Sequence, residues 1–180
     1  MRIRPAEAAD GAGCAAIYAP FVTGTAVSFE AEPPGPAQMA ERITRCRLTH
    51  PWYLAEDADT LLGYAYAAAH RERPAYRWAA EVSVYVAPPA RHREVARALY
   101  ARLLTDLSEC GYRLALAGIT LPNPASVALH EAMGFEPVGV YRGVGYKLGA
   151  WHDVGWWQRS LGVGATGDPA PPVLYREISG

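Results

Sequence analysis

The chain has 180 residues, of which 51% are hydrophobic and 19% are charged, and its formal net charge is −1. This length suits one domain with a sizeable core, and this composition excludes disordered and fibrous proteins. The nearly neutral charge balance gives no electrostatic reason to expect nucleic acid or an anionic membrane as a partner.

The cysteines and the N-terminal residues indicate where the protein works. Cys14, Cys46 and Cys110 are odd in number and widely spaced, which favours a reducing compartment over a disulfide framework. No Cys-x-x-Cys or histidine-rich spacing suggests a metal site. The charged residues at the start are not followed by the apolar run of a signal peptide, and no apolar stretch has the length of a membrane span. We therefore expect a cytoplasmic protein without a metal.

The first half of the chain is expected to contain two helices and four strands. Asp10 is placed to cap the first helix, and Pro33-Pro34-Gly35-Pro36 separates it from the second. Met39 and Ile43 give the second helix its apolar face. The strands are expected near Ile3 and over residues 52–55, 61–69 and 80–86.

The second half is expected to alternate helices with strands. Pro88-Pro89 ends the fourth strand, and apolar residues at helical spacing predict a long helix up to about Cys110. The elements that follow are a strand over 114–120, a helix over 125–133, and two strands that end near residue 158. Residues 163–180 are rich in Gly and Pro and are expected to form an irregular tail, so that residues 1–162 make up the single domain.

The expected order of elements is β-α-α-β-β-β-α-β-α-β-β. This order does not contain the regular β-α-β repeats of a parallel sheet. The order therefore predicts an α+β, or mixed α/β, fold in which helices flank a largely antiparallel central sheet.

One carboxylate stands out in the strand over 80–86. Glu81 precedes Val82-Ser83-Val84-Tyr85-Val86, and the strand period places Glu81 on the same face as Ser83 and Tyr85. Its burial is costly unless it lies in a cleft or forms a hydrogen bond. Local sequence leaves two interpretations open: an edge-strand carboxylate that faces water, or a general base.

The helix over 125–133 carries a second group of polar residues. Asn123 stands at its start, with Ser126 and His130 at offsets of three and seven residues. Asparagine is a common helix cap, and a lone histidine on a helix is usually structural. Taken singly, neither residue indicates a function.

Taken together, these motifs resemble a known enzyme family. They are Ala80-Glu81-Val82-Ser83-Val84-Tyr85-Val86, Asn123 with His130, and His130-Glu131-Ala132-Met133-Gly134-Phe135. The chain resembles, over residues 2 to 161, the phosphinothricin N-acetyltransferase branch of the GNAT superfamily. The resemblance implies a GNAT-like fold and transfer of acetyl from acetyl-CoA to the amine of a small polar amino acid, such as phosphinothricin, methionine sulfone or methionine sulfoximine.

The resemblance implies a role for each catalytic candidate. Glu81 would be the general base that removes a proton from the amine, and His130 would protonate the departing thiolate or act as a second base. Attack would be direct, without an acyl-enzyme, because no cysteine lies near the proposed site in the sequence.

The resemblance also implies an acetyl-CoA site. The Val84-Tyr85-Val86 backbone would receive the pantetheine arm like another strand, and Asn123 would contact the cofactor. The family's pyrophosphate loop, Arg/Gln-x-x-Gly-x-Gly/Ala, corresponds to Arg91-His92-Arg93-Glu94-Val95-Ala96. Glu94 replaces the glycine that lets backbone N–H groups approach the pyrophosphate at a helix N-terminus.

The residue at this glycine position leads to a specific prediction. We expect Glu94 to turn its carboxylate outward, toward Arg97 or Arg91. Glu94→Gly is expected to tighten acetyl-CoA by about tenfold and, because glycine adds backbone freedom, to cost up to about 1 kcal/mol of stability.

Three further residues match the substrate pocket of the same branch, namely Phe29, Arg73 and Tyr76. Arg73 would supply a cation and Tyr76 a hydroxyl to the anionic groups of the substrate. Lys147 and His152 match the closing segment of the family. Their role there is either catalysis or packing and dimer contacts, and the sequence leaves these alternatives open.

The resemblance further suggests a homodimer that acts on a small-molecule amine. One alternative of another class remains, a catalytically impaired member of the fold that serves as a ligand-binding or interaction module. Glu94 favours the alternative, whereas the retention of the other catalytic and pocket residues favours the enzyme.

Overall fold

The structure is a computed structural model that describes residues 1–91, 94–162 and 168–175. Its α-helices and strands follow the expected order, and three short 3₁₀ turns, η1 to η3, lie between them. The elements are β1 (Arg2–Pro5), α1 (Gly11–Gly24), α2 (Pro36–Arg47), β2 (Trp52–Asp57), β3 (Thr60–Ala69), β4 (Ala79–Val86), α3 (Val95–Glu109), β5 (Leu114–Leu121), α4 (Pro124–Ala132), β6 (Glu136–Lys147) and β7 (Ala150–Ser160).

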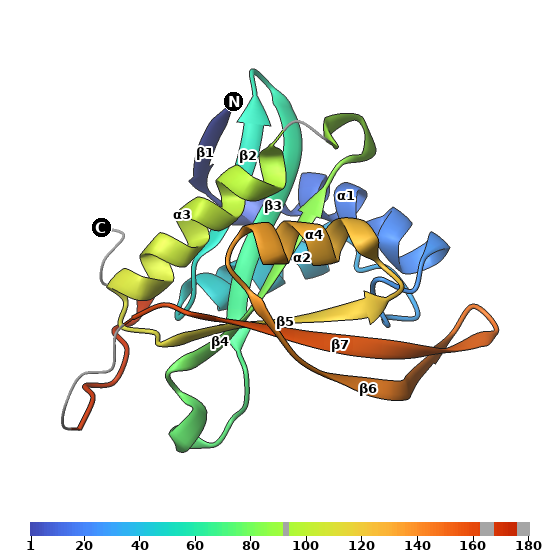
Figure 1. Ribbon diagram of the computed structural model, residues 1–180. Coiled ribbons are helices and arrows are strands. Elements are labelled where there is room, and N and C mark those ends of the chain that lie inside the picture. Colours follow the sequence, from blue (N-terminus) through green and yellow to red (C-terminus); the bar gives the residue numbers. More distant parts are fainter. Residues whose placement is uncertain (92–93, 163–167, 176–180) are drawn as a thin grey trace.

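The strands form one seven-stranded sheet in the described part of the chain, in the order β1-β2-β3-β4-β5-β7-β6. Every neighbouring pair is antiparallel except β4 and β5, which run parallel. Helices α3 and α4 lie on one face of the sheet and α1 and α2 on the other (Figure 1). The predicted fold class, an antiparallel sheet flanked by helices, is confirmed.

Each face of the sheet has its own hydrophobic core. Leu99, Leu103 and Leu107 of α3 are buried in one core, and α1 and α2 contribute to the other. β4 serves both cores, because Val82 belongs to the α3 core while Tyr85 packs against the α1 and α2 core. The two-residue period read from the sequence of this strand therefore assigned its faces correctly.

The pairing of β4 with β5 is short. The two strands pair at three positions only, Ala79 with Leu114, Ala80 with Ala115 and Glu81 with Leu116. Beyond them both strands continue, β4 to Val86 and β5 to Leu121, and in Figure 1 they point in different directions. A gap in the sheet therefore opens directly after Glu81.

The start of α3 differs from the expectation. Pro88–Ala90 forms the turn η3, and the helix begins only at Val95. Glu94 precedes it in a left-handed conformation, with φ +58° and ψ +11°. This backbone region is one that glycine adopts readily and other residues adopt at a cost.

The expected helix cap at Asp10 is wrong. Asp10 precedes α1, but its side chain makes no capping hydrogen bond to that helix. Its carboxylate instead accepts hydrogen bonds from the Arg4 guanidinium and from the backbone N–H of Glu7. The Arg4 guanidinium holds the pKa of the Asp10 carboxyl below its usual range. An ion pair with Arg4 of β1 and a hydrogen bond from the Glu7 N–H thus take the place of the expected cap.

The described part of the C-terminal segment, residues 168–175, packs onto the domain. The Trp78 indole N–H donates to the Ala170 carbonyl at 2.8 Å, and the Val173 N–H donates to the Cys110 carbonyl at 2.9 Å. Tyr175 is only 1% exposed and belongs to the α3 core. Within the described residues, no helix has both the length and the apolar character that crossing a membrane requires.

Candidate active site

Glu81 lies where the sheet opens, and it has a partner that the sequence did not indicate. His70 Nδ1 is 2.7 Å from Glu81 Oε1, and an Arg71 guanidinium nitrogen lies 3.8 Å from the same oxygen. About a third of the Glu81 side chain is exposed, so water or a substrate can reach it. β4 is an interior strand in which Glu81 pairs with both β3 and β5, so Glu81 is not an edge-strand carboxylate that simply faces water.

In β4, every second residue points its backbone N–H and C=O groups into the gap. The Ala87 N–H donates to the Leu62 carbonyl at 2.8 Å, so Ala87 points its backbone groups toward the β3 side. Because the direction alternates along a strand that pairs antiparallel, Val86 and Val84 point theirs away from β3, into the gap. Their N–H groups are therefore placed to bind an extended ligand there.

The loop between β3 and β4 carries two of the predicted pocket residues. Arg73 is exposed and precedes the turn η2 (Pro74–Tyr76). Tyr76 is 44% exposed, and its ring meets the His70 ring edge-on at a centroid distance of 5.8 Å. Tyr76 thus lies beside the His70–Glu81 pair, and Arg73 stands in the same loop.

Phe29 lies on a segment that is bound to the β6–β7 hairpin. The Phe29 ring is so close to the backbone of Gly145 that any side chain there would collide with it. Its ring centroid is 6.3 Å from that of His152. Phe29 is partly exposed, which leaves one side of the ring open to a ligand.

Lys147 holds this segment in place. Its ammonium group donates to three backbone carbonyls, those of Val22 and Ser28 at 2.6 Å and that of Glu30 at 2.9 Å. His152 in turn bonds the Lys147 carbonyl through Nε2 at 2.9 Å. For these two residues the structure supports packing of the segment within one chain.

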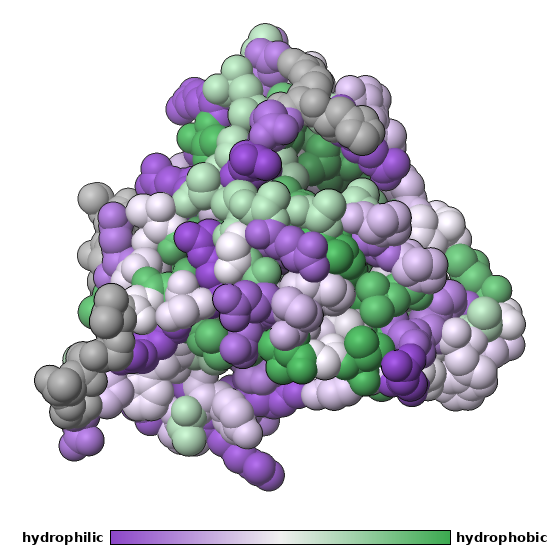
Figure 2. All heavy atoms as spheres, viewed as in Figure 1, coloured by the Kyte–Doolittle hydropathy of each residue, from purple (hydrophilic) through white to green (hydrophobic). Residues whose placement is uncertain are grey.

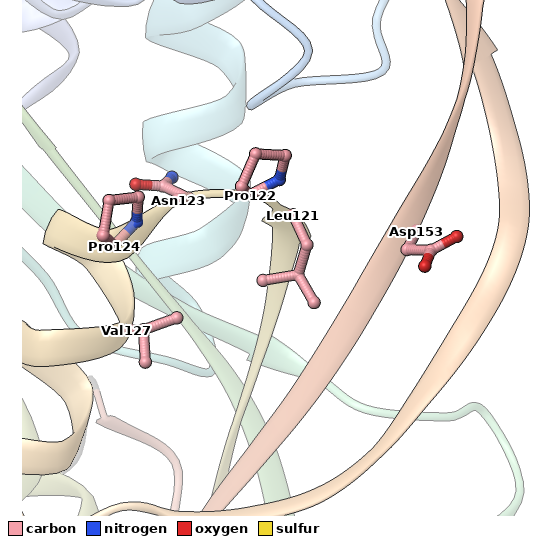
Figure 3. A pocket seen from close by; sticks show the side chains of 6 residues that line it. All are labelled: Leu121, Pro122, Asn123, Pro124, Val127 and Asp153. Carbon is pink, nitrogen blue, oxygen red and sulfur yellow. The ribbon is translucent and has the colours of Figure 1, made fainter.

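Asn123 caps α4, as its position suggested, because its side-chain oxygen accepts the Ser126 N–H at 3.2 Å. It also lines an open cavity of about 560 Å³ between α4 and β7. In Figure 3, Leu121 and Val127 flank this cavity, and Asp153 turns its carboxylate away toward β6, where it accepts the Gly143 N–H at 2.7 Å.

This cavity does not surround Glu81. It lies at the end of β5, five residues beyond Leu116, which is about 16 Å along a strand. Hydrophobic side chains gather around it on the surface, between α4 and the β6–β7 hairpin (Figure 2). The residues that line the cavity come from β5, α4, the turn between them and β7, so the cavity lies away from the Glu81 carboxylate.

His130 is buried, with 4% of its surface exposed. Its Nδ1 is 2.7 Å from the Ser126 carbonyl, and its Nε2 is 3.0 Å from the Tyr100 hydroxyl. Nδ1 must therefore carry a proton that it donates, and Nε2 accepts from Tyr100. Burial lowers the pKa of this histidine, which keeps the ring neutral. Both ring nitrogens are engaged in the core rather than at Glu81.

The predicted pyrophosphate loop is only partly described. His92 and Arg93 lie outside the described residues, while Arg91 is exposed and packs over the Phe21 ring at 5.7 Å. The Glu94 carboxylate points to Arg97, with Oε2 2.9 Å from Nε. The expected outward turn of Glu94, toward Arg97, is confirmed. Val95 and Ala96 begin α3 directly after it.

Comparison with known proteins agrees with this geometry. The family model of the acetyltransferase (GNAT) domain matches residues 3–156. The chain belongs to this acetyltransferase family. The enzyme class expected from the sequence is therefore confirmed.

Several relatives of this acetyltransferase cover nearly its whole length. A phosphinothricin N-acetyltransferase of Streptomyces viridochromogenes is 38% identical, over 99% of this chain and 95% of the relative. An L-methionine sulfoximine/L-methionine sulfone acetyltransferase of Salmonella typhimurium is 32% identical, over 93% and 99%. A solved GNAT phosphinothricin acetyltransferase from Sinorhizobium meliloti, in complex with AcCoA, superimposes with a TM-score of 0.90 at 36% identity, over 97% of this chain and 98% of that one.

In this acetyltransferase, the sequence did not indicate His70 as a site residue, and it did not indicate which groups Lys147 binds. His70 follows the apolar run of β3, and a residue-by-residue reading of β3 against β4 would have placed it on the face of Glu81. Lys147 was noted, but its three carbonyl partners lie more than a hundred residues earlier in the chain. No local pattern reveals such a contact.

Proposed function

We propose that this acetyltransferase moves the acetyl group of acetyl-CoA to the α-amine of a small amino acid that bears a second polar group. Phosphinothricin, methionine sulfone and methionine sulfoximine are the substrate candidates. One observation carries the proposal: Glu81, a partly exposed carboxylate, stands at the point where β4 and β5 separate. The named activities of full-length relatives support the same substrate class.

The gap between β4 and β5 is the proposed site of the thioester cosubstrate. When bound, acetyl-CoA supplies an activated acetyl group. Val84 and Val86 point their N–H groups into the gap and donate to the pantetheine arm or to the oxyanion that forms during attack. Asn123, which lines the cavity between α4 and β7, is the proposed further contact of the cosubstrate.

Glu81 performs the proton transfer in this proposal. Amines are mostly protonated near neutral pH and must lose a proton before they attack. The carboxylate takes that proton through Oε2, directly or through one water, because the His70 hydrogen bond occupies Oε1. Tyr76 and Arg73 bind the anionic groups of the amino acid, and Phe29 packs against its apolar stem.

The proposed role of His130 as an acid stays a prediction. The burial of His130 supports a structural role as the alternative. His130→Gln separates the two. Since the variant leaves Tyr100 without its buried partner, a structural role predicts a loss of about 1–3 kcal/mol of stability and a nearly unchanged kcat well below Tm. A large loss of kcat at unchanged Tm would instead identify His130 as the acid.

The substrate proposal is tested by an assay of thiol release. Acetyl-CoA is offered with a panel of amino acids and their sulfone, sulfoximine and phosphinate analogues, and cofactor binding is measured separately by calorimetry. We expect turnover with at least one of the named analogues and little with simple apolar amino acids. Cofactor binding without turnover across the panel would support the ligand-binding alternative.

The left-handed backbone at Glu94 corrects the expected stability of Glu94→Gly. Glycine relieves the positive φ, so this substitution should raise the free energy of unfolding by about 1–2 kcal/mol rather than lower it. Loss of the carboxylate should also lower the Kd for acetyl-CoA. The expected change is about threefold to tenfold, because Arg97 already screens the charge.

Glu94→Ala is the matched control, since it removes the charge but keeps the strained backbone. Urea unfolding should show the gain in stability for glycine alone, whereas titration calorimetry should show tighter binding for both variants. Weaker binding of acetyl-CoA by both would mean that the pyrophosphate does not lie at this helix start.

We further propose that the enzyme works as a homodimer in the cytoplasm. β6 is the edge strand of the sheet, and much of the β6–β7 hairpin is exposed although it is apolar. Its exposed hydrophobic residues are Val138, Val140, Tyr141, Val144, Tyr146, Leu148 and Trp151. The three cysteines are free, which suits a reducing compartment, and the small net charge supports no nucleic-acid or membrane partner.

The dimer is tested by sedimentation equilibrium. We expect a mass near 39 kDa, twice that of one chain (~19.5 kDa), and dissociation of the Val140→Lys variant, because a charge in an apolar interface is costly. Arg142→Lys, an exposed change of the same strand that keeps its charge, is the control and should leave the mass unchanged. A wild-type protein that sediments as one chain would contradict the proposal.

A further inference from the structure

We propose that His70 is a positioning residue for the general base: its Nδ1–H fixes the Glu81 carboxylate so that Oε2 faces the substrate amine. This inference rests on the proposed function, because it assumes that Glu81 takes the proton. It concerns a residue that lies outside the motifs of the family resemblance.

The strand register explains why His70 reaches Glu81. Ala68 of β3 stands directly opposite Glu81, and its methyl group cannot bond a carboxylate. His70 lies two residues further on, on the same face, at the diagonal position that longer side chains can bridge. The ring therefore takes the space that Ala68 leaves open, and Nδ1 approaches Oε1 to 2.7 Å.

The imidazole is held by its neighbours. It meets the Tyr76 ring edge-on at 5.8 Å and the Trp156 ring at 6.0 Å, with interplanar angles of 74° and 75°. Its side chain is 17% exposed, half the exposed fraction of Glu81. A ring packed between two aromatic side chains has little freedom to turn, so its hydrogen bond fixes the orientation of the carboxylate.

The hydrogen bond between His70 and Glu81 assigns a role to each of their polar atoms. An ionised carboxylate only accepts, so Nδ1 donates to Oε1. Within the described part of the chain, the ionisable side chains in contact with the His70 ring are Glu81 on β4 and Tyr76 in the following loop; Arg71 donates to the His70 backbone carbonyl, and Trp156 on β7 does not ionise. Because His70 and the closest approach of Arg71 both involve Oε1, Oε2 is the oxygen that takes the proton of the amine.

Two substitutions separate positioning from packing. His70→Phe keeps an aromatic ring between Tyr76 and Trp156 but removes the donor, whereas His70→Asn keeps an N–H near the place of Nδ1. We expect His70→Phe to lower kcat by about tenfold or more, with KM for acetyl-CoA within about twofold, and His70→Asn to recover most of the loss. Glu72→Gln, an exposed change in the same loop, is the control and should match wild type.

The pH profile provides a readout that a packing role would not change. A carboxylate that loses a hydrogen bond to its charged form holds its proton more tightly. In His70→Phe the acidic limb of the kcat/KM profile should therefore move to higher pH, while His70→Asn should keep the wild-type limb. Thermal unfolding of each variant shows whether it is folded at the assay temperature.

The outcomes distinguish this inference from the proposed function. An active wild type with an impaired Glu81→Gln, but with unchanged kcat and pH profile in His70→Phe, would overturn the role of His70 alone. Equal losses in His70→Phe and His70→Asn, with an unmoved acidic limb, would overturn it as well. A wild type without turnover across the amine panel would overturn the proposed function itself.

The pair can also be observed without turnover. In ¹⁵N spectra of the histidine rings, the signal that disappears in His70→Phe belongs to His70. We expect it to show a proton on Nδ1 and to shift in Glu81→Ala at constant pH. A His70 signal that is identical in wild type and Glu81→Ala would overturn the contact on which the inference stands.

Discussion

Glu81→Gln is expected to lower kcat by about 100-fold or more, while the Kd for acetyl-CoA stays nearly unchanged. The amide has the shape of the carboxylate and still accepts a hydrogen bond from His70, so the substitution removes proton abstraction and little else. The loss should become smaller as the pH rises, because the amine then loses its proton unaided.

The measurement is kcat and KM from pH 6 to 10, with a phosphinothricin-like or methionine-sulfone-like amine. Calorimetry with acetyl-CoA shows whether the cofactor site is intact, and a thermal melt shows whether the fold is. A loss of equal size at every pH, or none at all, would mean that another group accepts the proton.

Tyr175→Ala is expected to cost about 3–5 kcal/mol of stability, which is typical when a large aromatic side chain is removed from a core. Tyr175 is 1% exposed, and its hydroxyl lies 2.7 Å from that of Tyr53, which donates in turn to Asp106. Arg102 completes the network, with Nε 2.9 Å from Asp106 and its guanidinium over the Tyr53 ring. The segment is therefore part of the folded domain.

Two comparisons make this prediction specific. Tyr175→Phe removes only the hydroxyl and should cost about 1 kcal/mol, whereas Val173→Ala, at a more exposed position in the same segment, should cost less than Tyr175→Ala. Urea unfolding gives the three free energies, and Tm should fall by about 10 °C for Tyr175→Ala. A Tyr175→Ala protein as stable as wild type would show that the segment does not pack in solution.

Prediction from sequence succeeded where the cause is local. The alternation of Val82 and Tyr85 between two cores follows from strand geometry, and the Asn123 cap follows from the unpaired N–H groups at a helix start. It failed at Asp10, because a charged partner from β1 competed with the local cap.

In the candidate site, too, the sequence indicated the features with a local cause and did not indicate those that depend on tertiary packing. Glu81 was identified from its polarity in an apolar strand, and Glu94 from its difference from a glycine pattern. Neither observation indicates a φ of +58° at Glu94 or a neutral His130 bonded to Tyr100. The contact of His130 with Tyr100 depends on how α3 packs against α4, which lies far from any local pattern.

The sequence by itself determined the order of the elements, the faces of β4 and the resemblance that names the enzyme class. These follow from side-chain periodicity, from Pro and Gly breaks and from short motifs, all of which act within a few residues. Only the tertiary structure decided that β4 and β5 separate after Glu81, that His70 reaches its carboxylate, and that Lys147 binds the segment of Phe29. Each depends on strand register or on packing between distant parts of the chain, and no short stretch of sequence encodes either.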